Sequence, residues 1–367
     1  MFWNQEYAPS LGGVEIYTQN LAHKLAAKGH DVLVVSSHSN ESFDRHAIIE
    51  GIPVHRFPFF QALTSRDHAA IFEIQKEVAG LRQRFRPDLV HINFTDASPF
   101  FYLRTKPRKD AAVVVFHSPL DTAPGGLQLG KTLAVQVGRL IAPSRFLASH
   151  LEEVLSLPEG KVEVIRNGVH EGRFLKTYEA SSAEPVFVFA GRLVRDKGVQ
   201  VLIEAFSKLT ARHKAKLRIV GAGPERALLE EQISRMGLRD IIEFAGMLPQ
   251  ESLARCMAEA AAVVIPSIFS DPAPLVATEA ALAGKAVIAS KIGGLPEIVL
   301  HGETGLLVEP GDAGQLAGAM EKLLLEPETA KQYGKRARGR AIAEFTLTAM
   351  TEKYERLYQE LLSDSLV

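Results

Sequence analysis

The chain has 367 residues, of which 46% are hydrophobic and 23% charged, and its formal net charge is −1. This length suits about two domains, the composition is typical of a protein that buries large cores, and the near-neutral charge argues against a general nucleic-acid binder. The single cysteine, Cys256, allows no disulfide within the chain and favours a reducing compartment.

No apolar run approaches the length of a membrane span. The opening residues, MFWNQEYAPS, have neither the basic flank nor the apolar core of a signal peptide. We therefore expect a cytoplasmic protein. Two basic clusters are interpreted either as solvated helix ends or as a patch that contacts an anionic membrane peripherally, at its inner face. The clusters are Arg82, Arg84 and Arg86, and Arg104, Lys106, Arg108 and Lys109.

Short apolar runs rich in Val and Ile alternate with helical patterns through the first half. Their continuous apolar character predicts strands buried on both faces, and hence a parallel sheet covered by helices. A helical pattern opens at Gly12 and Gly13, and another spans 71–85 and stops before Pro87. The predicted strands lie within 31–37, 88–94, 111–117 and 162–169.

The polar stretch 177–185 interrupts this rhythm and is interpreted as an interdomain linker. The alternation then restarts, and the last stretch, 312–363, is almost purely helical in pattern. Two consecutive doubly wound α/β units are therefore the expected architecture. The predicted strands of the second unit lie within 186–191, 216–221, 241–246, 262–267, 286–290 and 305–310.

Two cations follow the first strand of the second unit. Arg192 and Lys197 stand five residues apart, just before a helical pattern opens near Gly198. In a doubly wound sheet, ligands bind outside the carboxyl ends of the strands, where helix N-termini attract anions. We interpret the cations either as a clamp for a diphosphate or as a solvated turn in which Arg192 pairs with Asp196.

Two acids eight residues apart follow the predicted strand 262–267. Asp271 lies in a proline-rich loop, and Glu279 lies in the helical pattern that comes next. A loop carboxylate is able to hold sugar hydroxyls, and a buried carboxylate near a helix start is able to bind a ribose diol. The alternative interpretations are a helix N-cap for Asp271 and an acid that compensates the helix dipole for Glu279.

Paired glycines and one histidine complete the candidate residues. Gly12 and Gly13 would let a ligand approach the backbone closely, or would form only a flexible turn, and Gly293 and Gly294 repeat the arrangement. His117 ends an apolar run, so it is expected at the edge of a sheet, where it serves either a site or only the local structure.

The segment IVGAGPER, residues 219–226, has two of the three glycines of a dinucleotide-binding fingerprint, but Arg226 stands where the third belongs. The sequence contains no Asp-x-Asp pair and no Cys/His cluster with metal-ligand spacing. It also lacks a Gly-x-Ser-x-Gly elbow and a Walker loop. We therefore expect no metal and no cofactor, so that Arg192, Lys197 and helix N-termini would neutralise a diphosphate.

An ordered set of motifs runs through nearly the whole chain. The first half contains LGGVE, LAAKGHDV, PDLVH, IAPS and VEVIRNGV. The second half contains GRLVRDKG, IVGAGPE, EFAGMLP, VVIPS, the two acids, IGGLPEIV, GETGLLVEPGD and a tyrosine-bearing last helix. In this order the set resembles the retaining GT-B glycosyltransferases grouped as family four.

The resemblance implies two Rossmann-like domains that face each other across a cleft, with the last helix crossing back to the first domain. The acceptor-side domain would comprise 1–178 plus 348–367, and the donor-binding domain 179–347. The implied activity is metal-independent, retaining transfer of a sugar from a UDP-sugar or GDP-sugar to a hydroxyl. The acceptor would be a glycan, a lipid-linked or a small molecule, in the synthesis of cell-surface glycans or glycolipids.

The resemblance also implies roles for individual residues. Arg192 and Lys197 would grip the diphosphate, and Glu279 would hold the ribose. Asp271 would hold the sugar ring, and His117 would approach the sugar from the first domain. The acceptor hydroxyl would attack as the diphosphate leaves, which needs no pair of carboxylates flanking the bond. The implied phosphate, donor or acceptor contacts further include Gly12, Gly13, Leu275 and Val276.

Several positions depart from the family's pattern. Only three residues precede Asn4 where the family has a hydrophobic strand, so the start could be truncated or misassigned, or a central strand lost. Asp271 is shorter than the usual Glu, Pro272 and Pro274 lack the N–H groups that glycine-rich loops offer, and His170 replaces the usual Asp.

Three other functions remain open on the sequence. One is a degenerate, non-catalytic sugar-binding subunit, and another is a nucleotide-sugar epimerase or a phosphorylase of the same fold. A dinucleotide oxidoreductase rests only on the GAGPER segment and is disfavoured.

Overall fold

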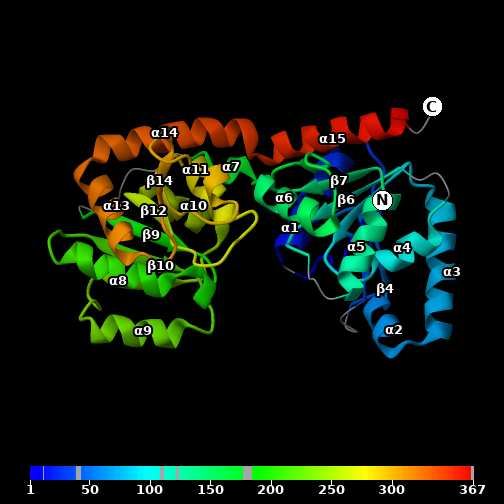
Figure 1. Ribbon diagram of the computed structural model, residues 1–367, viewed down its shortest axis with the longest axis horizontal. Helices are drawn as coiled ribbons and strands as arrows, with labels where there is room; N and C mark the ends of the chain where they lie inside the picture. Colours follow the sequence, from blue (N-terminus) through cyan, green and yellow to red (C-terminus); the bar gives the residue numbers. More distant parts are fainter. Residues whose placement is uncertain (11, 39–42, 108–110, 121–123, 177–183, 365–367) are drawn as a thin grey trace. The chain divides into compact units, whose positions relative to one another are not determined.

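The computed structural model describes residues 1–10, 12–38, 43–107, 111–120, 124–176 and 184–364 (Figure 1). The chain divides into two compact units, one formed by Met1–Arg166 with Met350–Val367 and the other by Asn167–Ala349. Most of the expected linker lies outside the described residues, as do Arg108 and Lys109 of the second basic cluster.

The first unit is built on a sheet in the order β3-β4-β2-β1-β5-β6-β7-β8. Its strands are parallel except for the antiparallel edge pair β3 and β4. Its strands are β1 (Phe2–Trp3), β2 (Val34–Ser37), β3 (His46–Ile49), β4 (Ile52–Phe57), β5 (Leu89–Phe94), β6 (Ala111–Phe116), β7 (Arg139–Ala142) and β8 (Val162–Val164). Its helices are α1 (Gly13–Ala27), α2 (Phe59–Ser65), α3 (His68–Phe85), α4 (Pro99–Thr105), α5 (Pro124–Gln136), α6 (Arg145–Leu155) and most of α15 (Leu347–Asp364).

Strand β1 is short but occupies the centre of the first sheet. Phe2 and Trp3 pair in parallel with β2 on one side and β5 on the other. Trp3 is fully buried, its ring stacks on Phe59 at 5.4 Å, and its Nε1 donates to Ser98 Oγ at 3.1 Å. A central strand is therefore present before Asn4, and the interpretation that it has been lost is wrong.

The second unit is built on an all-parallel sheet in the order β11-β10-β9-β12-β13-β14. Its strands are β9 (Val186–Ala190), β10 (Lys216–Val220), β11 (Ile242–Gly246), β12 (Ala262–Ile265), β13 (Val287–Ser290) and β14 (Gly305–Val308). Its helices are α7 (Glu171–Phe174), the 3-10 turn η1 (Arg195–Lys197), α8 (Val199–Thr210), α9 (Arg226–Arg235), α10 (Gln250–Glu259), α11 (Leu275–Leu282), α12 (Leu295–Ile298), α13 (Ala313–Leu325) and α14 (Pro327–Glu344).

Both faces of the second sheet are buried, as the continuous apolar runs predicted. Along β9, Phe187 and Phe189 belong to one hydrophobic cluster, whereas Val188 and Ala190 belong to another. Successive side chains of a strand point to opposite faces, so these clusters lie on the two sides of the sheet. The expected pair of doubly wound parallel α/β units is confirmed.

The C-terminal stretch is helical and returns to the first unit. From Met350 onward α15 belongs to that unit, where the Tyr354 ring lies 5.2 Å from His91. The segment 167–178, which the sequence placed with the first unit, falls largely in the second, because Val169 donates to Phe345 O and accepts from Leu347 N, both at 2.9 Å.

Among the described residues of the two basic clusters, the side chains differ in exposure. Arg82 is buried, and its guanidinium lies 5.1 Å from the Tyr102 ring centre. Arg84, Arg86 and Arg104 are exposed. Within the described residues, none of the helices has both the length and the apolar character that crossing a membrane requires.

Candidate active site

Two loops of the second unit meet where the strand order of its sheet reverses. One follows β9 and the other follows β12, and these strands are neighbours. Gly198 adopts φ 71°, and a Cβ there would lie 1.8 Å from Pro266 O. Ile268 N also donates to Asp196 O at 2.9 Å. Such a switch point is where open α/β sheets bind ligands, and the N-terminus of α8 opens at the same place.

The first loop carries both predicted cations, and the second carries an acid that pairs with one of them. Lys197 Nζ lies 2.7 Å from Asp271 Oδ2, with the two side chains 25% and 30% exposed. Arg192 is exposed and makes no ion pair within the described residues, so the alternative pairing with Asp196 does not occur there. The site therefore holds one internally neutralised cation and one cation facing solvent.

The glycine-rich segment after β10 packs against the loop that carries Arg192 and forms backbone hydrogen bonds with it. Leu193 N donates to Ala222 O at 2.8 Å, and Glu225 N donates to Leu193 O at 3.0 Å. A Cβ on Gly223 would lie 2.3 Å from Leu193 O, and one on Gly221 would collide with the neighbouring loop in the same way. These glycines allow two loops to approach each other closely. This packing explains why the segment has two glycines of a dinucleotide-binding fingerprint, and it requires no bound dinucleotide.

Asp271 does not cap the helix that follows it. Helix α11 begins at Leu275 after Pro274, and no side-chain oxygen caps its first amides. Asp271 Oδ1 instead accepts a hydrogen bond from Ala273 N at 3.1 Å, which fixes the carboxylate in its loop. Leu275 and Val276 form the first turn of α11 and are half-buried.

Glu279 lies one turn further along α11. Its side chain is half-buried, and no described residue donates a hydrogen bond to its carboxylate. Burial raises the pKa of Glu279 to about 7, because removing water destabilises the ionised form. A partly buried acid without a partner, on the helix that follows the Asp271 loop, is a favourable place for a polar ligand.

Replacing Glu279 with Gln is expected to raise the melting temperature at about pH 8 and to change it little near pH 4.5. Between pH 4.5 and about 7, the unfolded chain releases a proton that the folded protein keeps. The wild-type free energy of unfolding therefore falls across this window and stays low above it. Thermal unfolding across this pH range checks the prediction, with the exposed Glu303→Gln as control. A Gln variant less stable than wild type at about pH 8 would contradict it.

His117 joins a buried polar network at the carboxyl edge of the first sheet. His117 Nε2 lies 2.6 Å from Asn93 Oδ1, and Asn93 Nδ2 donates to Asn4 Oδ1 at 2.7 Å. Asn4 Nδ2 donates in turn to Thr18 Oγ1 at 2.8 Å. Because Asn93 Oδ1 accepts, Nε2 of His117 carries the proton and Nδ1 is left as an acceptor.

Burial also fixes the charge of this histidine. It lowers the pKa of His117 to about 3, so the imidazole is neutral at any pH near 7. The Tyr17 ring packs edge-on against it, with ring centres 4.9 Å apart. His117 is thus held as a neutral hydrogen-bond acceptor, with a fixed tautomer and a packed orientation.

Of the two glycines at the start of α1, only Gly13 leaves open space. A Cβ on Gly12 would lie 2.1 Å from Glu15 Oε2, whereas one on Gly13 would meet nothing within 4 Å. Burial raises the pKa of Glu15. The Glu15 side chain must turn away before a ligand reaches Gly12.

A cavity of about 270 Å³ opens at the carboxyl ends of β5 and β6. Asp96 Oδ1 accepts from Ser98 N at 3.1 Å and from Ser98 Oγ at 2.7 Å, and burial raises the pKa of Asp96. Thr95 Oγ1 is buried without a hydrogen-bond partner. The lining includes Phe94, Thr95, Asp96, Ser118, Leu120 and Leu129.

The sequence did not single out Asn4, Thr18, Asn93 or Asp96. One signal was available, since Asn93 interrupts the otherwise apolar end of LVHINF, and a buried amide needs hydrogen-bond partners. No group of three or more His, Cys, Asp or Glu in the described part of the chain is arranged to hold a metal ion.

Two family models match consecutive parts of the chain. The model of glycosyl transferases group 1 matches residues 172–340, and the model of glycosyltransferase family 4 matches residues 11–173. An uncharacterized glycosyltransferase of Methanocaldococcus jannaschii is 29% identical over 351 residues, which cover 87% of each chain. Together the models account for nearly all of the chain.

Solved structures share the fold over both units. A glycosyltransferase of Rickettsia africae matches with a TM-score of 0.85 at 24% identity, over 98% of each chain. Anabaena HepE in complex with UDP matches with a TM-score of 0.80 at 20% identity, over 98% of this chain and 99% of that one. HepE has also been solved with UDP-glucose.

Proposed function

Because this chain belongs to the glycosyltransferases of group 1 and family 4 and has their GT-B fold, we propose that it is a retaining glycosyltransferase that uses a nucleoside diphosphate sugar. The observation that carries the proposal is the convergence of Arg192, Lys197, Asp271 and Glu279 at the switch point of the second sheet. Two cations beside the N-terminus of α8 suit a diphosphate, and the two acids suit the hydroxyls of a sugar and a ribose.

The chemical step forms one bond and breaks another on the same face of the sugar. The acceptor oxygen bonds to the anomeric carbon while the bond from that carbon to the diphosphate oxygen breaks with its electron pair. The hydroxyl proton passes to the departing diphosphate. Lys197 and Arg192 stabilise the charge that develops on the leaving group, so the step needs neither a carboxylate nucleophile nor a metal.

In the first unit, His117 and the cavity beside Asp96 are the groups that we assign to hydroxyl binding. The neutral His117 accepts a hydrogen bond at Nδ1, which suits a sugar or acceptor hydroxyl. The cavity combines a carboxylate and a hydroxyl with apolar walls, a combination typical of sites for small polar ligands. A glycan, a lipid-linked or a small hydroxyl compound would fit this chemistry.

We further propose a role in cell-surface glycan or glycolipid synthesis, with a cytoplasmic location and peripheral contact with the inner face of the membrane. The single cysteine supports a reducing compartment. The exposed cations Arg84, Arg86 and Arg104 support contact with anionic lipid, although the burial of Arg82 reduces the number of available charges.

Thermal unfolding with UDP, GDP, ADP, NAD and FAD, each with and without a chelator, tests the donor class. We expect stabilisation by UDP or GDP that the chelator does not change. Ligand at 100 times its dissociation constant adds about 2.7 kcal/mol to the free energy of unfolding. HepE, which binds UDP and UDP-glucose, makes UDP the first ligand to try.

A nucleotide that stabilises the protein is then tested as its sugar derivatives, with a panel of hydroxyl acceptors and detection of the released nucleoside diphosphate. Transfer with retained anomeric configuration supports the proposal. Stabilisation by NAD or FAD alone would overturn it. Tight binding of a nucleoside diphosphate without any turnover would favour the non-catalytic sugar-binding subunit.

A further inference from the structure

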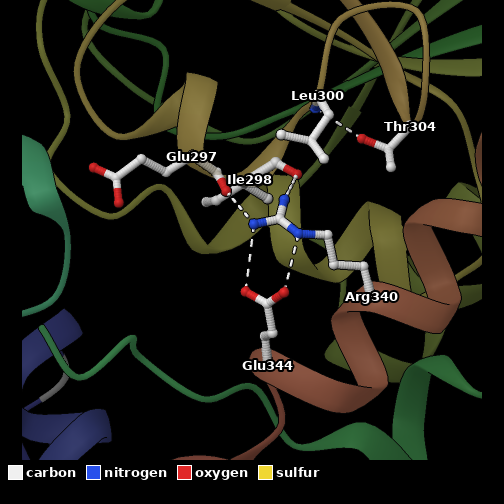
Figure 2. Close-up of polar contacts among 6 residues, drawn as sticks. All are labelled: Glu297, Ile298, Leu300, Thr304, Arg340 and Glu344. Atoms are coloured by element: carbon white, nitrogen blue, oxygen red, sulfur yellow. Dashed lines mark hydrogen bonds and ion pairs between the residues drawn. The ribbon is translucent and has the colours of Figure 1, made fainter.

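The short helix α12 is held at its C-terminal end by an arginine from α14 (Figure 2). Arg340 Nη1 donates to Ile298 O at 2.9 Å, and Nη2 donates to Glu297 O at 2.7 Å. Carbonyls at the end of a helix have no partner within it, and a guanidinium is well suited to bind two of them at once. Arg340 therefore fixes the end of α12 from outside.

The Arg340 side chain is itself fixed. Its Nε and Nη2 lie 3.2 and 3.3 Å from the two carboxylate oxygens of Glu344, one turn further along α14. The Phe345 ring covers the guanidinium, with 5.2 Å between Cζ and the ring centre. The side chain is only 19% exposed. This arrangement is more rigid than an ordinary surface ion pair, which orders little.

The N-terminal end of α12 contacts the turn that carries Asp271. Gly294 N donates to Asp271 O at 2.9 Å, and Gly293 adopts φ 59°. A Cβ on Gly293 would lie 2.5 Å from Asp271 O, and one on Gly294 would lie 2.1 Å from Pro272 O. Backbone thus packs against backbone here with no room for a side chain, so a shift of α12 must move the turn.

We infer that Arg340 is a positioning residue that holds the Lys197–Asp271 pair in place through α12. The contacts form one continuous path from Arg340 to the end of α12, then from Gly294 to Asp271, and from Asp271 Oδ2 to Lys197 Nζ. The effect on donor binding rests on the proposed function, whereas the mechanical link, by which Arg340 fixes the position of Asp271 through α12, does not.

The test compares amide hydrogen exchange and UDP binding in Arg340→Met, Arg340→Lys and Gly294→Ala. Arg340→Met removes both hydrogen bonds to α12, Arg340→Lys keeps the charge, and Gly294→Ala disturbs the same path from the Asp271 side with the arginine intact. The matched controls lie on α14. They are Arg336→Met, which changes an exposed arginine, and Gly339→Ala, whose added methyl meets nothing within 4 Å.

In Arg340→Met we expect exchange in peptides covering 266–274 and 291–296 to rise by about tenfold or more. Exchange in α8 should stay as in wild type. The dissociation constant for UDP should rise by about tenfold, and the controls should match wild type. Arg340→Lys should recover only part of the loss, because an ammonium group cannot reproduce the forked contacts of a guanidinium. A lowered melting temperature alone would not produce this local pattern.

Faster exchange confined to 297–304, or spread evenly over the second unit, would overturn the inference. Unchanged UDP binding in Arg340→Met would overturn it too, provided that Lys197→Ala weakens binding. If Lys197→Ala leaves UDP binding unchanged while exchange rises at both ends of α12, the mechanical link stands and the proposed function fails.

Discussion

Replacing Lys197 with Ala is expected to lower the rate of sugar transfer by about 10²–10³-fold, and replacing Arg192 with Ala by a similar factor. Under the proposed function, each change removes a cation that stabilises the charge developing on the departing diphosphate. The protein should keep its fold, because Arg192 is exposed and Lys197 is 25% exposed. Initial rates with the donor identified by the nucleotide screen provide the measurement.

The neighbouring Arg195→Ala is the matched control, since this exposed arginine lies in the same turn. It should transfer sugar at nearly the wild-type rate. The double variant that lacks both Arg192 and Lys197 should lose less than the product of the two single effects, because both groups act on one leaving group. Wild-type turnover in either single variant would exclude that residue from the diphosphate clamp.

Replacing Trp3 with Ala should destabilise the first unit by about 3–5 kcal/mol. The indole is fully buried in the central strand and contacts the Phe59 ring and Ser98 Oγ. Trp3→Phe keeps a ring and loses mainly the hydrogen bond, so it should cost less, with about 1 kcal/mol from that bond.

Urea unfolding followed by far-ultraviolet circular dichroism measures this effect, since the variants lose the only tryptophan of the chain. Phe72→Ala is the control, because Phe72 is 64% exposed on α3 and its loss should change stability little. A Trp3→Ala protein with the wild-type urea midpoint would show that β1 is not integral to the sheet.

The parallel strands of the second unit could be predicted closely from the sequence. Each predicted apolar run contains one strand, and the observed bounds differ by a few residues at most. Continuous Val and Ile signal burial on both faces, and this signal is local. The long helical C-terminal stretch was equally predictable, because its 3.6-residue pattern extends through α13, α14 and α15.

Four strands of the first unit were not predicted. Strands β3 and β4 form the antiparallel edge, where His46, His55 and Arg56 break the apolar pattern. Strand β1 has only two residues, which is too short for any periodicity to show. Strand β7 begins at Arg139, so its apolar run is only Leu140 to Ala142. Their positions follow from pairing with distant strands, which a single sequence does not display.

The candidate site likewise contains residues that local sequence patterns predict and residues that only the tertiary structure brings together. Arg192, Lys197, Asp271 and Glu279 could be located because they follow strands at a predictable edge of a sheet. The network of Asn4, Asn93 and His117 joins residues up to 89 positions apart. Two further features likewise depend on tertiary contacts: the packing of Gly223 against the Arg192 loop and the path from Arg340 to Asp271. No local sequence pattern predicts them.

The ion pair with Asp271 provides Lys197 with a counter-ion from the protein itself. Under the proposed function, an incoming diphosphate would displace a carboxylate that is already bound to the lysine. Binding would then replace one anion by another at an ammonium group that the carboxylate already holds in position. Under the proposed function, the same carboxylate would return to Lys197 when the diphosphate departs and would thereby assist product release.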